Sequence, residues 1–402
     1  MSFLEESSGL LGTHVNWEDI EDEVRLSLAT EARFGENKRM QVVGEMKGIM
    51  SRIVLIHPDW HPKCSNLPEE FAVKIASPLN FIEMSKSIEL GAENRKIDRI
   101  VRVLHNREVE AYRFLSENLP ENFPNLKIYC AKKFSAENVE KGFLVLEFAE
   151  NIAHISMFES IEIAEILPVV KAISKFSAIG YAENRLKFAA GPDFITHVLA
   201  EFGDVGFREK IYGKLRGMRG FFGGDLVKLE NLIEIFRSSM LPENVAKLTR
   251  ICEILGHPPV PVHGDLWPGN LLFTQGNPLK LRAIIDWQAV NFGSPAQDLD
   301  RLFISILSAK NRRENLDFLL GIYYQEFAEN LEPPFTFEQL KKSYQLLFPI
   351  QAFMVLPGFL SMSEIPENSE IFGFAREKSI GMMEDVLKAH ADNLLDFPGF
   401  FE

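Results

Sequence analysis

One eight-residue segment constrains this chain more than any other. It reads His-Gly-Asp-Leu-Trp-Pro-Gly-Asn at positions 263–270, apolar runs flank it on both sides, and Asp286 follows a β-prone stretch downstream. An aspartate, an asparagine five positions later and a second aspartate after a strand are the groups that Mg²⁺-dependent phosphoryl transfer requires. The segment therefore predicts a loop between two strands that carries this chemistry.

Each residue type in the segment suits one task. Asp265 would accept a hydrogen bond from the attacking hydroxyl and so orient it. Asn270 and Asp286 would supply a neutral and a charged oxygen to Mg²⁺, which prefers oxygen ligands. Gly264 and Gly269 allow the loop to fold tightly.

The segment is convincing only in context. An Asp-x4-Asn pair is common by chance, and an isolated His-Gly-Asp is usually a turn. Upstream, positions 71–75 read as a β-strand with one lysine, Lys74, in an apolar setting. A lysine in such a strand can contact nucleotide phosphates. The alternative is a strand lysine that simply faces solvent.

A helix is expected after this strand. Val109 and Tyr112 recur at helical spacing within it. Glu108 is the first candidate for a helix glutamate that pairs with Lys74, and Glu110 is the fallback. Such a pair would hold the lysine ready for a nucleotide.

A hinge is expected after the next strand. That strand is apolar and ends on an acidic residue, Glu147. Backbone N–H and C=O groups of Glu147, Phe148 and Ala149 could read an adenine ring there. The chain would then divide into a nucleotide-binding lobe at 1–146, a hinge at 147–150, and a catalytic and acceptor-binding lobe at 151–402.

A loop that covers the phosphates is expected before the lysine-bearing strand. Positions 42–51 lie between two strand-like runs and end on Ser51. They contain Gly44 and Gly48, which would let the backbone approach phosphate. Two glycines in ten residues are also what any hairpin shows. Both interpretations stay open from the sequence.

The catalytic segment carries a family resemblance. Together with Ile-Ile-Asp-Trp-Gln at 284–288, it resembles the choline-kinase-like and ecdysteroid-kinase-like branch of the aminoglycoside phosphotransferase superfamily, in particular its nematode and insect members. The resemblance extends from about Val42 to beyond Leu302. It implies an α+β, bilobal protein-kinase-like fold. The N-lobe would be small, antiparallel and β-rich with one main helix, and the C-lobe larger and mostly helical.

The resemblance also implies roles for single residues. These are the catalytic Asp265, the metal ligands Asn270 and Asp286, and the nucleotide pair Lys74 and Glu108. His263 and Asp298 would support the catalytic loop, because Asp298 matches the structural aspartate that braces this loop through its backbone.

Two departures separate the chain from protein kinases. Position 264 is glycine where protein kinases usually carry arginine. Only twelve positions separate Asp286 from Asp298, which leaves little room for an activation loop and a peptide-docking platform. Both points argue against a regulated protein kinase.

Composition bears on the binding partners and on the location of the protein. The formal net charge of −14 disfavours non-specific nucleic-acid binding, which needs a basic surface. The three cysteines are widely spaced and suggest a reducing compartment. The first residues carry acids where a signal peptide needs bases, so a cytoplasmic location is expected. Positions 343–363 lack charge, but prolines interrupt them, which favours a buried helix over a stable membrane span.

The acceptor stays open. Trp267 and Trp287 each closely follow an aspartate of the site and could form an aromatic wall for a cation such as choline or for a steroid face. The alternative is that one or both pack beneath the catalytic loop. We therefore expect an ATP- and Mg²⁺-dependent phosphotransferase acting on the hydroxyl of a small molecule: choline-like, steroid-like or another metabolite alcohol. A catalytically weak ATP-binding pseudokinase or scaffold is the alternative, and the sequence does not indicate an oligomeric state.

Overall fold

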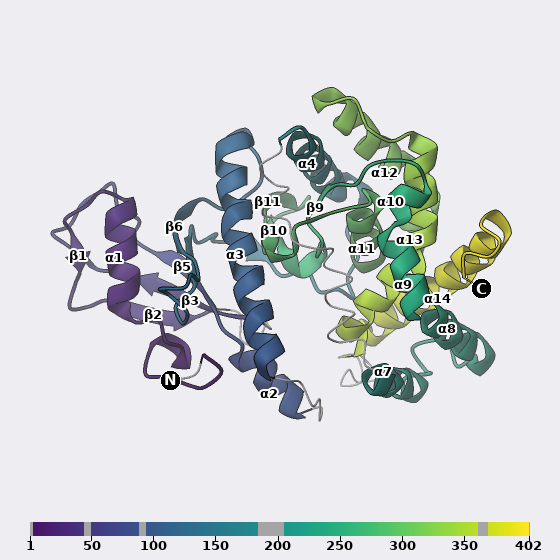
Figure 1. Cartoon of the computed structure of the whole chain (residues 1–402), viewed down its shortest axis with the longest axis horizontal. Helices are drawn as coiled ribbons and strands as arrows, with labels where there is room; N and C mark the ends of the chain where they lie inside the picture. The colour runs from purple at the N-terminus through teal and green to yellow at the C-terminus, as the bar shows by residue number, and fades with distance from the viewer. Residues whose placement is uncertain (1–2, 44–49, 88–93, 184–204, 361–368, 402) are drawn as a thin grey trace. The chain divides into compact units, whose positions relative to one another are not determined.

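A computed structural model describes residues 3–43, 50–87, 94–183, 205–360 and 369–401. The chain divides into two compact units, Met1–Glu150 and Asn151–Glu402 (Figure 1). Each unit is described by itself below.

The first unit is built on a five-stranded antiparallel sheet. The strands, in spatial order, are β2 (Arg39–Val42), β3 (Ser51–His57), β5 (Phe71–Ala76), β7 (Phe143–Leu146) and β6 (Ile128–Lys132). The central strand β5 is buried along almost its whole length. This agrees with its apolar sequence, because a central strand covered on both faces has no solvent side.

Helices cover both faces of this sheet, with α1 and α3 on opposite sides (Figure 1). Alternate residues of β5 point to opposite faces. Phe71, Val73 and Ile75 belong to one core with Ile20 of α1, whereas Lys74 points toward α3. The helices are α1 (Trp17–Ser27), α2 (Leu79–Ser87) and α3 (Asn94–Asn118), and short elements are η1 (Leu10–Gly12), β1 (Arg33–Phe34) and β4 (Trp60–His61).

The second unit is mostly helical with two small antiparallel sheets. The sheets are β11 (Lys280–Ile284), β10 (Leu271–Thr274) and β8 (Ile152–Ala153), and separately β12 (Asn291–Gly293) with β9 (Val260–Val262). The helices are α4 (Ile163–Ala182), α7 (Val205–Gly217), α8 (Leu226–Ser239), α9 (Pro242–Thr249), α10 (Ile251–Ile254), α11 (Ala296–Ile306), α12 (Ala309–Asn330), α13 (Phe337–Leu360) and α14 (Glu370–Asp396), with short turns η2 (Pro268–Asn270) and η3 (Trp287–Ala289).

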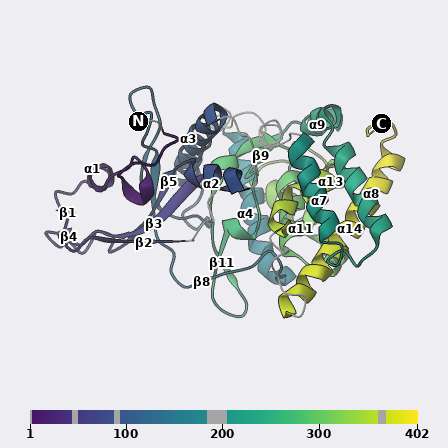
Figure 2. The ribbon, with the colours of Figure 1, turned by 90° about the horizontal axis from the view of Figure 1, so that it is seen from below.

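Helix α13 lies at the centre of the helical part of this unit. It packs against α11, α12, α14, α7 and α8, and Figure 2 shows it among α7, α8, α11 and α14. Leu346, Ile350 and Leu356 on this helix are fully buried. The uncharged stretch at 343–363 is thus a buried helix as far as it is described, and no helix in the described ranges is long and apolar enough to cross a bilayer.

A buried lysine ties α14 to two distant parts of the second unit. The Nζ of Lys378 donates to the carbonyls of Met157 at 2.8 Å, Glu159 at 2.7 Å and Ser305 at 2.7 Å. An ammonium group has three N–H donors, so the three acceptors match it. The last turn of α11 and the loop before α4 are joined in this way.

The α+β class predicted from the sequence is confirmed, with a smaller β-rich antiparallel first unit and a larger, mostly helical second one. The one main helix of the first unit is α3, and α1 and α2 are further helices that the sequence analysis did not anticipate. The predicted phosphate-loop residues Gly44 and Gly48 lie outside the described residues. The strand-like runs on either side of them are β2 and β3.

Candidate active site

The first unit buries a lysine–glutamate pair between β5 and α3. The Nζ of Lys74 lies 2.7 Å from both carboxylate oxygens of Glu108. The two side chains are only 10% and 2% exposed. The fallback residue, Glu110, pairs instead with Lys133 and Arg113. Loss of either member of a buried pair leaves an uncompensated charge, so the two residues hold each other in place.

The predicted hinge residues follow β7 directly. The N–H of Glu147 donates to the carbonyl of Lys127 at 2.8 Å, and its Oε2 accepts from the N–H of Lys127 at 3.2 Å. This N–H is therefore committed to the sheet and is not a candidate for reading adenine. The hypothesis now rests on the carbonyl of Glu147 and on the backbone groups of Phe148 and Ala149, and all three residues are half-buried. Ser51, the last residue of the predicted phosphate loop, is buried at the start of β3.

The catalytic segment forms a loop between β9 and β10 that is held from α11. The N–H of His263 donates to Oδ2 of Asp298 at 2.6 Å, and the N–H of Gly264 donates to Oδ1 at 2.8 Å. Asp298 lies in the first turn of α11 and is buried. Burial raises the pKa of Asp298, whereas the two N–H donors favour its charged form.

The loop has no space for a side chain at position 264. Gly264 has a φ of +84°. A Cβ there would overlap the carbonyl oxygen of Ala289 and lie 2.7 Å from Nδ2 of Asn291. The absence of the arginine found in protein kinases therefore has a local steric cause.

His263 links the loop to the end of β11. The N–H of Asp265 donates to its Nδ1 at 3.2 Å, so Nδ1 is the acceptor nitrogen of the ring. The other nitrogen, Nε2, lies 3.0 Å from the carbonyl of Ile285 and donates to it. The ring also packs on Trp287, with centroids 4.7 Å apart.

Trp287 is fully buried beneath this loop. Its indole N–H donates to the carbonyl of Ile284 at 3.0 Å, and its ring packs on Phe176 with centroids 4.8 Å apart. This position contradicts the predicted role of Trp287 as an acceptor wall. Trp267 keeps part of its surface exposed. Its ring lies against Gly269, since a Cβ on that glycine would be only 2.6 Å from Cζ2 of Trp267.

Asp265 and Asn270 bond directly. The Nδ2 of Asn270 donates to the backbone carbonyl of Asp265 at 2.7 Å and to its Oδ2 at 3.3 Å. Both N–H groups of the amide are thereby used within the loop. The amide oxygen Oδ1 is the end of this side chain that suits a cation.

Asp286 is held beside Asn270 by the backbone. The N–H of Ile285 donates to the carbonyl of Asn270 at 3.0 Å. Asp286 itself adopts a left-handed conformation with φ +63° and ψ +57°, and its Oδ2 accepts from Nε2 of Gln288 at 3.2 Å. An amide oxygen and a carboxylate on adjoining segments fit Mg²⁺, which is usually held by few protein ligands together with phosphate oxygens and water. No group of three or more His, Cys, Asp or Glu side chains able to hold a metal occurs in the described residues.

Arg301 is a residue of this site that the sequence analysis missed. It lies on α11, three positions after Asp298, and one of its guanidinium nitrogens forms an ion pair with Oδ1 of Asp265. The two side chains are 14% and 16% exposed. Positions three apart share a helix face. The predicted role of Asp298 as a support of the catalytic loop therefore also indicated that Arg301 would face this loop.

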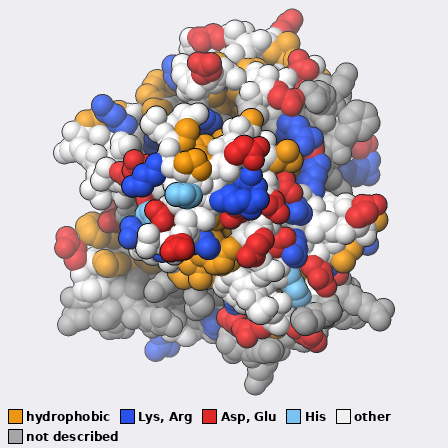
Figure 3. All heavy atoms as spheres, turned by 90° about the vertical axis from the view of Figure 1, so that its left-hand side faces the viewer, with side chains coloured by type: hydrophobic (Ala, Val, Ile, Leu, Met, Phe, Trp, Pro, Cys, Tyr) orange, Lys and Arg blue, Asp and Glu red, His pale blue; other side chains and the backbone are white. Residues whose placement is uncertain are grey.

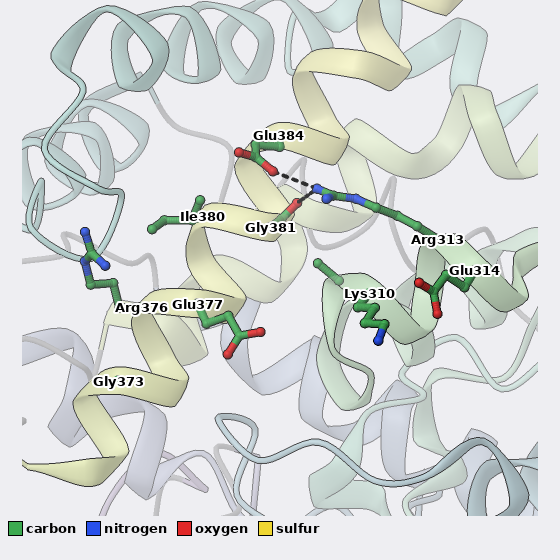
Figure 4. A pocket seen from close by; sticks show the side chains of 10 residues that line it. Lys310, Arg313, Glu314, Gly373, Arg376, Glu377, Ile380, Gly381 and Glu384 are labelled. Carbon is green, nitrogen blue, oxygen red and sulfur yellow. Dashed lines mark hydrogen bonds and ion pairs between the residues drawn. The ribbon is translucent and has the colours of Figure 1, made fainter.

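A hollow of the second unit lies away from these residues. It has a volume of about 470 Å³ and lies between α12 and α14, where Lys310, Arg313, Arg376 and Glu377 are among the residues that line it (Figure 4). Both charge signs contribute to it, and none of the predicted site residues lines it.

The antiparallel sheet with its buried Lys–Glu pair and the braced His-Gly-Asp loop of the helical unit together define a kinase-like protein. Residues 3–394 match the model of a family described as DUF1679, Uncharacterized oxidoreductase dhs-27, and the chain belongs to this family. The kinase-like resemblance recognised in the sequence is confirmed.

The relatives are kinase-like as well. The uncharacterized kinase-like protein D1044.1 of Caenorhabditis elegans is 26% identical over 296 residues, which cover 70% of this chain and 73% of the relative. Among solved structures, a choline kinase of Cryptosporidium parvum has 12% identity and a TM-score of 0.48, covering 91% of this chain and 94% of that one. An ethanolamine kinase of Plasmodium vivax has 12% identity and a TM-score of 0.42, covering 87% and 82%. At these values the two structures carry no argument about substrate.

The sheets of the described residues differ from those of the dinucleotide-binding fold that many oxidoreductases use. Every strand pair in the described residues is antiparallel. The dinucleotide-binding fold of many oxidoreductases needs a parallel sheet with helices on both faces. The fold of this chain is kinase-like.

Proposed function

We propose that this protein is an ATP- and Mg²⁺-dependent phosphotransferase whose acceptor is the hydroxyl of a small molecule. The observation that carries the proposal is the braced loop: Asp298 holds its backbone, and the bond from Ile285 to Asn270 brings the segment of Asp286 beside it. This arrangement supports an acceptor-orienting carboxylate, Asp265, next to two oxygen ligands for a metal.

The remaining residues take complementary roles. Lys74, held by Glu108, would contact nucleotide phosphates, and backbone groups of Phe148 and Ala149 would read adenine. Oδ1 of Asn270 and the carboxylate of Asp286 would hold Mg²⁺, which neutralises charge on the phosphates when it is bound. Asp265 would accept the hydrogen bond of the acceptor hydroxyl.

The step balances as a single displacement. The acceptor oxygen forms a bond to the γ-phosphorus of ATP, and the bond from that phosphorus to the β,γ-bridging oxygen breaks. The bridging oxygen leaves on ADP with the electron pair. The hydroxyl proton passes to Asp265 or, through it, to solvent.

A small acceptor is favoured over a protein. The connection from Asp286 to α11 is part of the core, since Trp287, Ala289, Val290 and Asn291 are fully buried. It offers no exposed loop on which a peptide would dock. The half-buried Trp267 suits a choline-like cation or a flat apolar face such as a steroid.

Surface and cysteine chemistry fit the expected partners and location. On the face shown in Figure 3, acidic and basic side chains are interspersed among the described residues. Such a surface does not favour nucleic acid. No disulfide joins the three cysteines, which all lie in the described ranges, and this fits the cytoplasmic location expected from the sequence.

The experiment compares wild type, Asp265→Asn and a matched control, Asp317→Asn, which lies on the surface of α12. Each protein is incubated with Mg-ATP and a metabolite extract containing choline, ethanolamine and ecdysteroids. Mass spectrometry identifies compounds that gain a phosphoryl group. We expect one acceptor to be phosphorylated by wild type and the control only.

Two results would contradict the proposal. Full turnover by Asp265→Asn would remove Asp265 from the reaction. Tight Mg-ATP binding by calorimetry without any phosphorylated compound and without ATP hydrolysis would favour the ATP-binding scaffold.

A further inference from the structure

Helix α11 presents two charged side chains to the catalytic loop. Asp298 and Arg301 are three positions apart and share one helix face. Asp298 accepts the backbone N–H groups of the loop. Arg301 reaches the carboxylate of Asp265 itself.

The carboxylate of Asp265 is held at both oxygens. Oδ1 forms the ion pair with Arg301, and Oδ2 accepts from the Asn270 amide at 3.3 Å. One partner comes from α11 and the other from η2. Rotation about the bond to the carboxylate would break at least one of these contacts, so the carboxylate plane has a set orientation.

Arg301 depends on Asp265 in return. Its Nε is buried and meets no hydrogen-bond acceptor in the described part of the chain. Among the described residues, Asp265 is the acid that pairs with the guanidinium and therefore orients it. Because both side chains are largely removed from water, their attraction is screened less than that of a surface pair.

We propose that Arg301 is a positioning residue, which fixes the carboxylate of Asp265 before the acceptor binds. This inference rests on the proposed function. A planar guanidinium constrains a carboxylate better than the point charge of a lysine does, so the residue type matters as well as the charge. The expected benefit is in the rate, because a reacting group misplaced by about 1 Å can cost about 100-fold.

The test uses the full chain with Arg301→Gln, Arg301→Lys and a control, Arg250→Gln, which removes an exposed arginine paired only with Glu253 in the described structure. Phosphoryl transfer is measured to the acceptor identified above or to water, and Mg-ATP affinity by calorimetry. We expect Arg301→Gln to lose about 100-fold in rate with unchanged affinity. The rate of Arg301→Lys should lie between the rates of Arg301→Gln and wild type, and the rate of Arg250→Gln should equal that of wild type.

Two further measurements separate positioning from a structural role. Added guanidinium ion should restore part of the rate of a folded Arg301→Ala variant, with folding checked by thermal melting. In a double-mutant cycle, Arg301→Gln should cause no further loss in the residual rate of ATP turnover that Asp265→Asn retains. A further full loss in that background would overturn the inference.

The failures can be told apart. If wild type neither binds Mg-ATP nor transfers phosphate, the proposed function fails and this inference with it. If wild type is active and folded Arg301→Gln is equally active, only the positioning role is wrong. If Arg301→Gln loses nucleotide affinity in proportion to rate, Arg301 serves nucleotide binding instead.

Discussion

Asp286 occupies a backbone conformation that most residues avoid. Its φ of +63° places it in the left-handed region, where a Cβ costs about 1–2 kcal/mol. Aspartate and asparagine tolerate this region better than other residues with side chains. Strain of this kind persists where the surrounding structure demands it, often at functional sites. The carboxylate is thus retained at a position where glycine would be easier to accommodate.

The first prediction concerns this residue. Asp286→Gly should be more stable to urea than Asp286→Ala by about 1 kcal/mol, because only alanine keeps the Cβ strain. Both variants should lose Mg-ATP affinity in calorimetry, since both remove the carboxylate. Equal stability of the two variants would show that the left-handed conformation carries no strain here.

Single residues were predictable where spacing encodes chemistry. Asp265 and Asn270 could be selected because their residue types and separation suit phosphoryl transfer. Arg301 could not be selected in the same way, since its contact with Asp265 arises only when α11 packs on the loop. For Trp287 the sequence leaves both an acceptor wall and packing beneath the loop open, because proximity to Asp286 does not reveal that its ring turns inward.

At the scale of elements, the loop between β9 and β10 depends on one glycine. Gly264→Ala should lower the free energy of unfolding by about 2–4 kcal/mol, because the Cβ would overlap the backbone of Ala289 in addition to straining φ. Urea unfolding measures this.

Gly256→Ala is the matched control for this substitution. Gly256 has a similar φ of +76°, but a Cβ there would meet only the side-chain nitrogen of Gln339 at 4.0 Å. Its cost should therefore be about 1 kcal/mol, from the backbone strain alone. Similar losses in the two variants would argue against the steric explanation.

Helix α11 also buries an acid that no described group pairs with. Asp300 is fully buried, and neither carboxylate oxygen has a hydrogen-bond partner in the described structure. Burial raises the pKa of Asp300 well above its ordinary value. As the pH rises above about 3.9, the unfolded chain therefore releases this proton first, and native stability falls until the pH passes the raised value.

The third prediction follows from this loss of stability with rising pH. Asp300→Asn removes the ionisation, so it should be more stable than wild type at pH 7, and the difference should vanish toward pH 4. Thermal or urea unfolding across this range measures the difference. Asp317→Asn, an exposed change, should show no such trend. A constant difference between Asp300→Asn and wild type at all pH values would contradict the raised pKa.

Elements were predictable where burial leaves a pattern. β5 is an apolar run with one lysine, and the helix with Val109 and Tyr112 shows the expected spacing. The helix α1 was missed, although Asn16 and Asp19 form a capping box that marks its start. A short amphipathic helix that packs on one face of a sheet leaves a weaker pattern than a buried strand does.

At the scale of the whole molecule, the second unit is closed by contacts between distant segments. Lys378→Met should destabilise the protein by about 3 kcal/mol, because three buried carbonyls lose their donor at about 1 kcal/mol each. Thermal melting is the measurement. The control Lys388→Met, on the exposed side of the same helix, should change stability little. Equal effects would mean that water replaces the lost donor.

The large-scale organisation was predictable only in outline. Strand patterns dominate the first part of the chain and helical patterns the rest, which is enough to infer an α+β protein with a smaller β-rich part. The Lys378 contact to Met157 joins residues 221 positions apart. No local pattern encodes such a contact, because it depends on how helices pack after they have formed.

Ile285 provides a single reporter for the state of the candidate site. Its N–H bonds Asn270 and its carbonyl accepts from His263. An opening of the loop that breaks the first bond exposes this amide to solvent exchange. Hydrogen–deuterium exchange at this one position would follow the ordering of the loop in real time, without a substrate.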